Sequence, residues 1–248
     1  MQHTHVLVSG ASRGIGAAIA LELAHSGTTV GCLSRSGSLG DLSGEDNDVI
    51  SRLIPLKTDV TDLEAFKSAM QSFTEITGHY PTGLVNNAGI HTACPSHLLS
   101  AEDFREVMDA NAVSVLFGCQ AVYPLMCEAG GGLIVNIGSF YDRLGIKQNI
   151  AYCASKAAVG AITRCLAVEW AKHEIRVLNI APGYIKTDIN RDAIDTGPLG
   201  KFLSKRIPRT TPGEPQEVAK LVSGLFAIDS GFLTGETIYL DGGQSITD

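Results

Sequence analysis

Three side chains in the second half of the sequence are of types that can move a proton: Ser139, Tyr152 and Lys156. Tyr152 and Lys156 are four residues apart, so on a helix they share one face. A phenol titrates near pH ~10, and a fixed ammonium group beside it favours the phenolate and lowers its pKa. Such a tyrosine can act as a general acid or base, while the Ser139 hydroxyl holds the substrate oxygen. The set favours proton transfer to or from an alcohol or carbonyl oxygen.

The same set fits acyl transfer poorly, because neither Ser139 nor Tyr152 has a histidine close in sequence. A Tyr-x-x-x-Lys spacing also occurs by chance on ordinary helix surfaces, so the surrounding elements have to support the chemistry. The apolar run 133–137 predicts a strand that ends just before Ser139. A helix from about residue 150 to about residue 172 is expected to carry Tyr152 and Lys156.

A glycine-rich turn follows the first apolar strand, which we predict over 5–9. The turn reads Gly10-Ala-Ser-Arg-Gly14-Ile-Gly16 and leads into a helix over 17–25. A strand, a glycine turn and a helix in this order can cradle a pyrophosphate, because backbone N–H groups and the helix dipole face the anion and glycine lets the main chain approach it. The spacing differs from the commoner G-x-G-x-x-G. Its place at the first strand–helix junction nevertheless favours a dinucleotide.

The residue after the second predicted strand, 28–34, is Arg35. NAD-binding sheets usually place an acidic residue here, where it binds the ribose 2′-hydroxyl. Arg35, together with Arg13 in the glycine turn, would instead suit a 2′-phosphate. The alternative is that both arginines are ordinary solvated residues. The pattern favours NADP(H), with NAD(H) possible.

Strands and helices alternate along the rest of the chain. Further strands are predicted over 53–57, 83–85, 133–137, 176–181 and 237–240, and helices over 62–78, 101–129 and 214–228. The acidic, Gly- and Ser-rich stretch 36–49 predicts a loop or a stunted helix. The alternation predicts an α/β fold with a parallel sheet covered on both faces. The segment 188–212 is expected to form a mobile substrate lid within one domain over 1–248.

Several polar residues lie where strands end or where the surroundings are apolar. Asp59 can accept the adenine amino group or cap the helix that follows. Asn87 can brace the sheet and close over the cofactor. Asn111 has apolar neighbours and needs a hydrogen-bond partner, either as a structural residue or as the anchor of a water near Lys156. His91, in the loop 90–99, can touch substrate, although a loop histidine is more often solvated.

Composition limits the function classes. A length of 248 residues suits one large α/β domain, and a net charge of −7 without a basic block argues against a nucleic-acid surface. We find no signal-peptide pattern and no apolar run near the ~20 residues that a membrane span needs. The six cysteines lack metal-site spacing. We expect a cytoplasmic protein with reduced thiols, no metal and no membrane or nucleic-acid partner.

Taken together, these motifs resemble the short-chain dehydrogenase/reductase family over nearly the whole chain. The matching elements are Gly10-x-x-x-Gly14-x-Gly16, Asp59, Asn86-Asn87-Ala88-Gly89, Asn111, Ser139, Tyr152-x-x-x-Lys156, Pro182-Gly183 and Asp241-Gly242-Gly243. The resemblance implies a single-domain Rossmann-type, doubly wound sheet of about seven parallel strands. It also implies a catalytic tetrad: Tyr152 as acid/base, Ser139 orienting the substrate oxygen, Lys156 lowering the tyrosine pKa and holding the nicotinamide ribose, and Asn111 retaining a proton-relay water.

The resemblance further implies a set of cofactor contacts. Around the pyrophosphate and ribose these are Gly10, Ser12, Arg13 and Ile15; around the adenosine, Asp59, Val60 and Asn87; at the nicotinamide end, Ile185 and Thr187. Further cofactor contacts are expected at Gly14, Gly16, Arg35, Gly89, Tyr152, Lys156, Pro182 and Gly183. Members of the family are often tetrameric, with the long helices and the last strand at the interfaces. A homotetramer, or a homodimer, is therefore expected.

Within the family, the arginines resemble NADP-preferring members similar to 3-oxoacyl carrier-protein reductases. Those proteins present basic residues to an acidic carrier protein near the end of the long fourth helix, where this chain has Cys127-Glu128-Ala129 and three glycines. Lys172 is the nearest base. The departure favours a small free ketone or alcohol, and we expect an NADPH-dependent carbonyl reductase. The alternatives are an NAD-dependent alcohol or sugar-alcohol dehydrogenase and a 3-oxoacyl-thioester reductase.

Two further readings fit less well. The intact tetrad argues against a non-enzymatic cofactor sensor, and the glycine turn with Lys156 argues against a halide-releasing relative. The substrate pocket is expected to take its shape from the lid and from Phe140, Tyr141, Leu144 and Tyr184.

Overall fold

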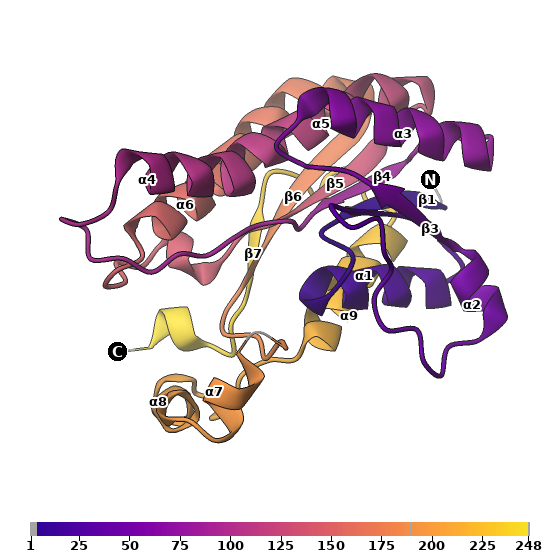
Figure 1. The fold of residues 1–248 in the computed structure, drawn as a ribbon. Coiled ribbons are helices and arrows are strands. Elements are labelled where there is room, and N and C mark those ends of the chain that lie inside the picture. The colour runs from indigo at the N-terminus through magenta and orange to yellow at the C-terminus, as the bar shows by residue number, and fades with distance from the viewer. Residues whose placement is uncertain (1–3, 189, 248) are drawn as a thin grey trace.

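The fold is built around one sheet of seven strands, all paired in parallel, in the order β3-β2-β1-β4-β5-β6-β7 (Figure 1). It is seen in a computed structural model, which describes residues 4–188 and 190–247. The strands are β1 (His5–Ser9), β2 (Thr29–Ser34), β3 (Leu53–Lys57), β4 (Gly83–Asn86), β5 (Gly132–Ile137), β6 (Ile175–Pro182) and β7 (Thr237–Leu240). The predicted doubly wound parallel sheet is confirmed.

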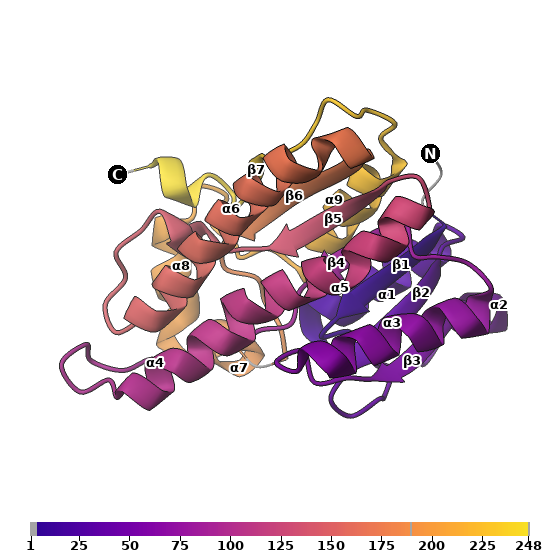
Figure 2. The ribbon, with the colours of Figure 1, turned by 90° about the horizontal axis from the view of Figure 1, so that it is seen from above.

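Helices cover both faces of this sheet (Figures 1 and 2). On one face lie α3 (Leu63–Thr77), α5 (Ser114–Glu128) and α6 (Ile150–Trp170), and on the other lie α1 (Gly14–His25) and α9 (Pro215–Ala227). The shorter helices are α2 (Asn47–Ser51), α4 (Ala101–Met108), α7 (Arg191–Asp195) and α8 (Pro198–Arg206). The five-residue α2 confirms the stunted helix expected after β2.

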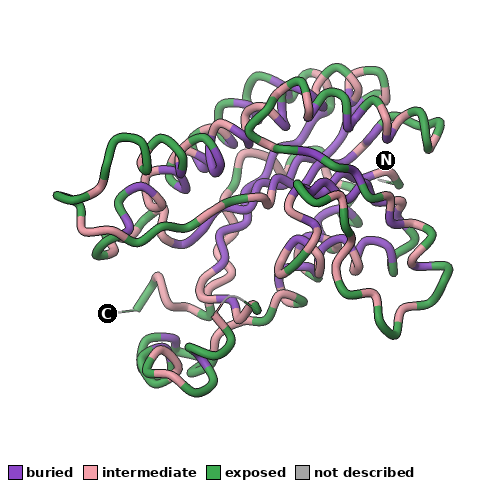
Figure 3. Tube along the Cα trace, viewed as in Figure 1, coloured by how far each residue is buried: buried purple, intermediate pink, exposed green. Residues whose placement is uncertain are grey.

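Side chains alternate along the strands between two buried layers. In β1, Val6 and Val8 belong to the core under α1 and α9, whereas Leu7 belongs to the core under α3, α5 and α6. Because both faces are covered, strands need not alternate with polar residues, and β5 and β6 are buried at every position. Figure 3 shows this burial along the sheet and on the helix sides that face it.

The long helix predicted over 101–129 is continuous but not uniform. Between α4 and α5 it makes a π-helical turn, Asp109–Val113, with Asn111 at its centre. Such turns are rare and are often found at functional sites.

No run long enough for a membrane span was expected from the sequence, yet Ala101–Glu128 meets that test by length and composition, with a mean hydropathy of 1.3 in its most apolar window. Half of that window is buried inside the fold. Buried core helices are also apolar, and this one packs on the sheet beside α3.

The segment predicted to form a lid contains α7 and α8. These helices gather around the buried side chains of Ile194, Leu203 and Ile207, against which Tyr184 packs. In Figure 1 they lie apart from the main body of the molecule, beyond the carboxyl ends of the strands. The lid therefore has a small core of its own, and its movement stays a prediction.

The strand order reverses between β1 and β4, and open α/β sheets bind ligands beyond the carboxyl ends of the strands at such a point. The two strand ends are joined there by Ser9. Its hydroxyl oxygen accepts hydrogen bonds from the backbone N–H groups of Asn87, at 2.9 Å, and Ala88, at 3.0 Å. This bridge holds the glycine turn after β1 beside the Asn-Asn-Ala-Gly segment after β4.

Candidate active site

Ser139 and Tyr152 meet at the carboxyl end of β5. Ser139 follows that strand and is 6% exposed, and Tyr152 lies in the first turn of α6. The Ser139 hydroxyl lies beside the Tyr152 phenol, and this polar interaction by itself lowers the pKa of the phenol. Burial acts more strongly in the other direction, and the net effect raises the pKa of Tyr152 above its usual value.

Lys156 lies one helical turn beyond Tyr152 and is 5% exposed. Its Nζ atom donates a hydrogen bond of 2.8 Å to the carbonyl oxygen of Ile137 and lies 5.7 Å from the centroid of the Tyr152 ring. Burial lowers the pKa of Lys156 to about 8. The amine is therefore charged at neutral pH and titrates within the range of ordinary assays.

Burial raises the pKa of Tyr152 in this structure, and a lowering of that pKa by Lys156 stays a prediction. Burial raises the pKa of the phenol more than the interaction with Ser139 lowers it, and Cys153 raises it slightly further. Lys156 itself is desolvated, and its amine is aimed at a neutral carbonyl group. Tyr152 thus rests as a neutral phenol, which is a proton donor.

Asn111 is fully buried, and its side chain makes three hydrogen bonds within the fold. Its Oδ1 accepts the backbone N–H of Ile90 at 2.7 Å, and its Nδ2 donates to the Ile90 carbonyl at 2.9 Å and to the Ser155 hydroxyl at 3.1 Å. Ser155 in turn donates to the Tyr152 carbonyl at 2.8 Å. These bonds tie the π-helical turn to the loop after β4 and to α6, which favours the structural alternative for the Asn111 side chain. A relay water held nearby stays a prediction.

The glycine turn has the geometry of an anion cradle. Gly10 has φ +67°, which L-residues with side chains rarely adopt, and a Cβ on Gly16 would lie only 2.2 Å from the Gly10 carbonyl oxygen. The helix α1 begins at Gly14, and no side chain caps its first N–H groups. Uncapped N–H groups at a helix start bind phosphate well, so the donors present here fit the pyrophosphate of a dinucleotide.

Two segments close around this turn. The Asn87 Nδ2 donates to the carbonyl oxygens of Ser9, at 3.0 Å, and Gly10, at 3.4 Å. Beyond β6, a Cβ on Gly14 would lie 3.7 Å from Thr187 Cγ2, so the predicted nicotinamide-side segment faces the glycine turn.

The other predicted cofactor residues lie at or just after the carboxyl ends of β1, β3, β4 and β6. They are Ser12, Ile15, Val60, Gly89, Pro182, Gly183 and Ile185. Ile185 is 7% exposed and packs into the core under α1 and α9. Gly89 leaves no room for a side chain, since a Cβ there would lie 2.9 Å from Asn111 Oδ1.

Arg13 and Arg35 are both exposed at the carboxyl edge of the sheet. Asp59, which follows β3, does not cap α3, and that alternative is corrected here: the cap is Asp62. The Asp59 carboxylate instead accepts the Thr61 N–H at 3.0 Å and the Thr61 hydroxyl at 2.7 Å. These bonds, with a smaller effect of Arg35, lower the pKa of Asp59.

His91 is part of the site. Its ring stands edge-on to the Tyr152 ring, with centroids 5.0 Å apart, and its Nε2 is hydrogen-bonded to Oδ1 of Asn149. From the sequence, His91 was expected either to touch substrate or to be solvated, and Asn149 and Ser155 were not predicted as site residues. A signal for Ser155 was available, because it lies three residues after Tyr152 on the same helix face.

Two tyrosines stand on another side of Tyr152. The Tyr141 ring is 5.7 Å from that of Tyr152, and the Tyr141 and Tyr184 hydroxyl groups are 2.8 Å apart. Burial, and then the bond to Tyr184, raise the pKa of Tyr141. Phe140 packs against Tyr184, and Leu144 is half-buried in the loop that follows. The predicted pocket residues therefore present neutral hydroxyl groups beside the proton donor.

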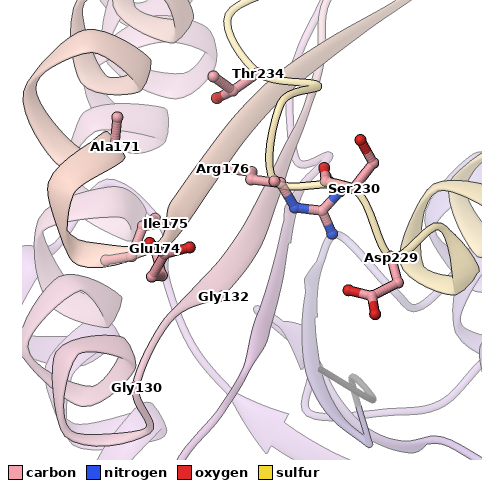
Figure 4. Close-up of a pocket in the computed structure, with 10 residues that line it drawn as sticks. Gly130, Gly132, Ala171, Glu174, Ile175, Arg176, Asp229, Ser230 and Thr234 are labelled. Carbon is pink, nitrogen blue, oxygen red and sulfur yellow. Dashed lines mark hydrogen bonds between the residues drawn. The ribbon is translucent and has the colours of Figure 1, made fainter.

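A separate cavity of about 260 Å³ lies at the amino ends of β5 and β6, where Glu174, Arg176 and Asp229 contribute to its lining (Figure 4). The amino ends form the edge of a parallel sheet opposite to the one that carries Tyr152. That cavity is therefore no part of the site. Among the described residues, no three His, Cys, Asp or Glu side chains are grouped so that they would hold a metal ion.

Comparison with known proteins places this geometry among dehydrogenases. A family model described as enoyl-(acyl carrier protein) reductase matches residues 10–245. Glucose 1-dehydrogenase of Gluconobacter oxydans is 37% identical over 251 residues, covering 97% of this chain and 91% of that protein. D-threitol dehydrogenase of Mycolicibacterium smegmatis is 32% identical, covering 97% and 92%. A solved short-chain type dehydrogenase/reductase from Mycobacterium marinum superposes with a TM-score of 0.88 at 30% identity, covering 98% and 96%.

Proposed function

The chain belongs to the short-chain dehydrogenase/reductase family, and on this premise we propose that it transfers a hydride between NADP(H) and a ketone or secondary alcohol, chiefly as an NADPH-dependent carbonyl reductase. It is an oxidoreductase that acts on CH–OH groups, and dehydrogenases of its family use NAD(P)(H). The observation that carries the proposal is the placement of Ser139 beside the Tyr152 phenol, with Lys156 one turn away, at the same sheet edge as the glycine cradle.

The dinucleotide, when bound, supplies or accepts the hydride. In the reductive direction Tyr152 donates its proton to the carbonyl oxygen as that oxygen gains charge, and Ser139 holds the same oxygen. The charged amine of Lys156 stabilises the phenolate that remains. Because these groups are buried, their charges act over a low-dielectric path and stabilise the transition state more than they would in water.

The preference for NADP(H) rests on Arg13 and Arg35. Both guanidinium groups are exposed at the carboxyl edge of the sheet, where the ribose is expected, and a guanidinium group can bind a phosphate through two parallel hydrogen bonds. The hydroxyl groups of Ser36 and Ser38, 2.6 Å apart, follow in the same loop. No carboxylate follows β2 until Asp41.

A second candidate is an NAD-dependent alcohol or sugar-alcohol dehydrogenase. The names of relatives favour it: besides the glucose and threitol dehydrogenases, an NAD-dependent glycerol dehydrogenase of Listeria innocua is 33% identical, covering 97% of this chain and 93% of that protein. A 3-oxoacyl-thioester reductase is the third candidate. The carboxyl end of α5 offers no basic residue for an acidic carrier protein, which favours a free small molecule as the substrate.

One experiment separates these readings. Purified protein is assayed with NADPH and NADH against simple ketones, keto sugars and a 3-oxoacyl thioester, and with NADP and NAD against the matching alcohols. The proposal requires faster oxidation of NADPH than of NADH with a free ketone. Turnover confined to NAD and polyols would replace it with the second candidate, and turnover confined to the thioester with the third.

We also propose that the protein works as a homotetramer or homodimer in the cytoplasm, with 188–212 as a lid. The edge strand β7 is only half-buried, and Val168 and Phe232 are 81% and 101% exposed. Uncovered edges and large apolar side chains are commonly covered by a partner. All six cysteines are free, as is usual in a reducing compartment. Light scattering after size-exclusion chromatography measures the number of subunits.

A further inference from the structure

The protonation of the His91 ring follows from its hydrogen-bond partner. The Asn149 side chain donates through Nδ2 to the Lys147 carbonyl at 2.8 Å. Its other polar atom, Oδ1, is therefore the one that faces His91 Nε2. An amide oxygen only accepts hydrogen bonds, so His91 Nε2 must carry a proton. In the neutral ring the other nitrogen, Nδ1, is then an acceptor.

That acceptor is available to a ligand. His91 is exposed, and within the described part of the chain Nδ1 has no hydrogen-bond partner. The ring is nevertheless held in place. Its Nε2 is bonded to Asn149, which is 8% exposed and directly precedes α6. Nearby, the Cys94 N–H donates to the Gln148 carbonyl at 2.8 Å, so the loop 90–99 is joined to the loop before α6 at a second point.

The His91 ring packs beside Tyr152, the proposed proton donor. Its ring centroid is 5.0 Å from that of Tyr152, and Tyr141 contacts Tyr152 from another direction at 5.7 Å. A substrate whose carbonyl oxygen bonds to Tyr152 therefore has a fixed acceptor, His91 Nδ1, and the hydroxyl groups of Tyr141 and Tyr184 around it. An unsubstituted alkyl ketone would leave His91 Nδ1 without a partner when it excludes water, which costs binding energy.

We infer that His91 is a specificity residue: its Nδ1 accepts a hydrogen bond from a hydroxyl group on the carbon next to the reacting carbonyl. The substrate class is accordingly the α-hydroxy ketones, with vicinal diols in the reverse reaction. This inference rests on the proposed function and deepens it. Asn149 is the positioning residue, because it fixes which ring nitrogen is free.

The test compares 3-hydroxy-2-butanone with 3-methyl-2-butanone, in which a methyl group replaces the hydroxyl. We expect wild-type kcat/KM to favour the hydroxy ketone by about 10-fold or more, since a site built to bind a hydroxyl group discriminates against its absence. His91→Ala removes most of this preference, because kcat/KM falls much more for the hydroxy ketone than for the methyl ketone. His97→Ala, in the same loop and also exposed, is the matched control and leaves both rates unchanged.

Two conservative variants separate recognition from support of the fold. The side-chain amide of Asn can place its oxygen near the position of Nδ1, whereas that of Gln can replace Nε2 and keep the bond to Asn149. We expect His91→Asn to retain part of the preference and His91→Gln to lose it. Thermal melting and cofactor titration confirm that each variant is folded.

The possible outcomes distinguish failure of this inference from failure of the proposed function. Equal use of both ketones by the wild type, or a parallel loss of both in His91→Ala, would overturn the inference and leave the proposed function standing. Turnover of neither ketone, nor of any other carbonyl compound, with either cofactor would overturn the proposed function and the inference together.

Discussion

The amine of Lys156 donates a hydrogen bond of 2.8 Å to the carbonyl oxygen of Ile137, two residues before Ser139. This bond draws the start of α6 against the end of β5, where Ser139 and Tyr152 meet. The arrangement buries a charged group beside a neutral acceptor, which costs stability. Function, rather than stability, accounts for a lysine at this position.

Lys156→Met is expected to stabilise the fold and abolish turnover. The pKa of Lys156 is lowered from 10.5 to about 8 by burial, so below pH 8 the folded state carries a buried charge at a cost on the order of 3 kcal/mol, part of which the bond to Ile137 offsets. We expect the variant to be more stable at pH 7 by about 1–3 kcal/mol in urea unfolding.

The sign of the pH dependence checks this account. Between the folded pKa and the unfolded pKa, the unfolded chain binds more protons at Lys156, so the stability of the wild type rises with pH across that window. The advantage of Lys156→Met should therefore shrink between pH 8 and pH 10.5. A constant difference over that range would contradict the assignment.

Carbonyl reduction is expected to slow as pH rises through about 8, the pKa of Lys156. Below that value the amine is charged and stabilises the developing phenolate of Tyr152; above it the amine is neutral. Alcohol oxidation should instead increase with pH, because the raised pKa of Tyr152 keeps the phenol protonated at neutral pH. Profiles of kcat/KM in both directions measure this, and Lys156→Arg, which does not titrate in this range, should lose the step near pH 8.

Exchange of Arg35 for aspartate tests whether the Arg35 guanidinium group binds the 2′-phosphate of NADPH. Loss of a charge-assisted hydrogen bond, with repulsion added, should raise KM for NADPH by about 10-fold or more and leave NADH favoured. Arg105→Asp makes the same charge change at an exposed position on α4 and should leave the ratio of the two cofactors unaltered. A preference for NADPH that survives Arg35→Asp would assign the two arginines to ordinary surface.

Gly16→Ala should prevent dinucleotide binding. The added Cβ would lie 2.2 Å from the Gly10 carbonyl oxygen and 2.5 Å from Asn87 Nδ2, so the turn has to shift. The matched control is Gly224→Ala, in the exposed side of α9 with nothing within 4 Å of the new Cβ. There alanine should stabilise the protein by about 1 kcal/mol. Fluorescence titration of NADPH and thermal melting report both effects, and normal NADPH affinity in Gly16→Ala would count against the cradle.

Much of the fold was predictable because the strands are short apolar runs bounded by breaking residues. The strands β1, β3 and β7 begin and end where the sequence places them. The Tyr-x-x-x-Lys pair could be found for a similar reason, since both residues lie on one helix and their spacing fixes a shared face.

The rest of the site depends on contacts between residues far apart in the chain. His91 and Asn149 are 58 residues apart, and Asn111 and Ser155 are 44 apart; no local pattern pairs them. The π-helical turn at Asn111 also lacks a local signal, since its neighbours are ordinary helix formers. The raised pKa of Tyr152 arises from burial, which spacing alone does not reveal.

Turnover by Tyr152→Phe tests the central claim most directly. The variant lacks only the phenolic oxygen, and the glycine cradle that binds the pyrophosphate is untouched. We expect NADPH oxidation with the best ketone to fall by at least about 100-fold, the usual contribution of a general acid, while NADPH still binds in a fluorescence titration. Turnover close to that of the wild type would show that another group supplies the proton.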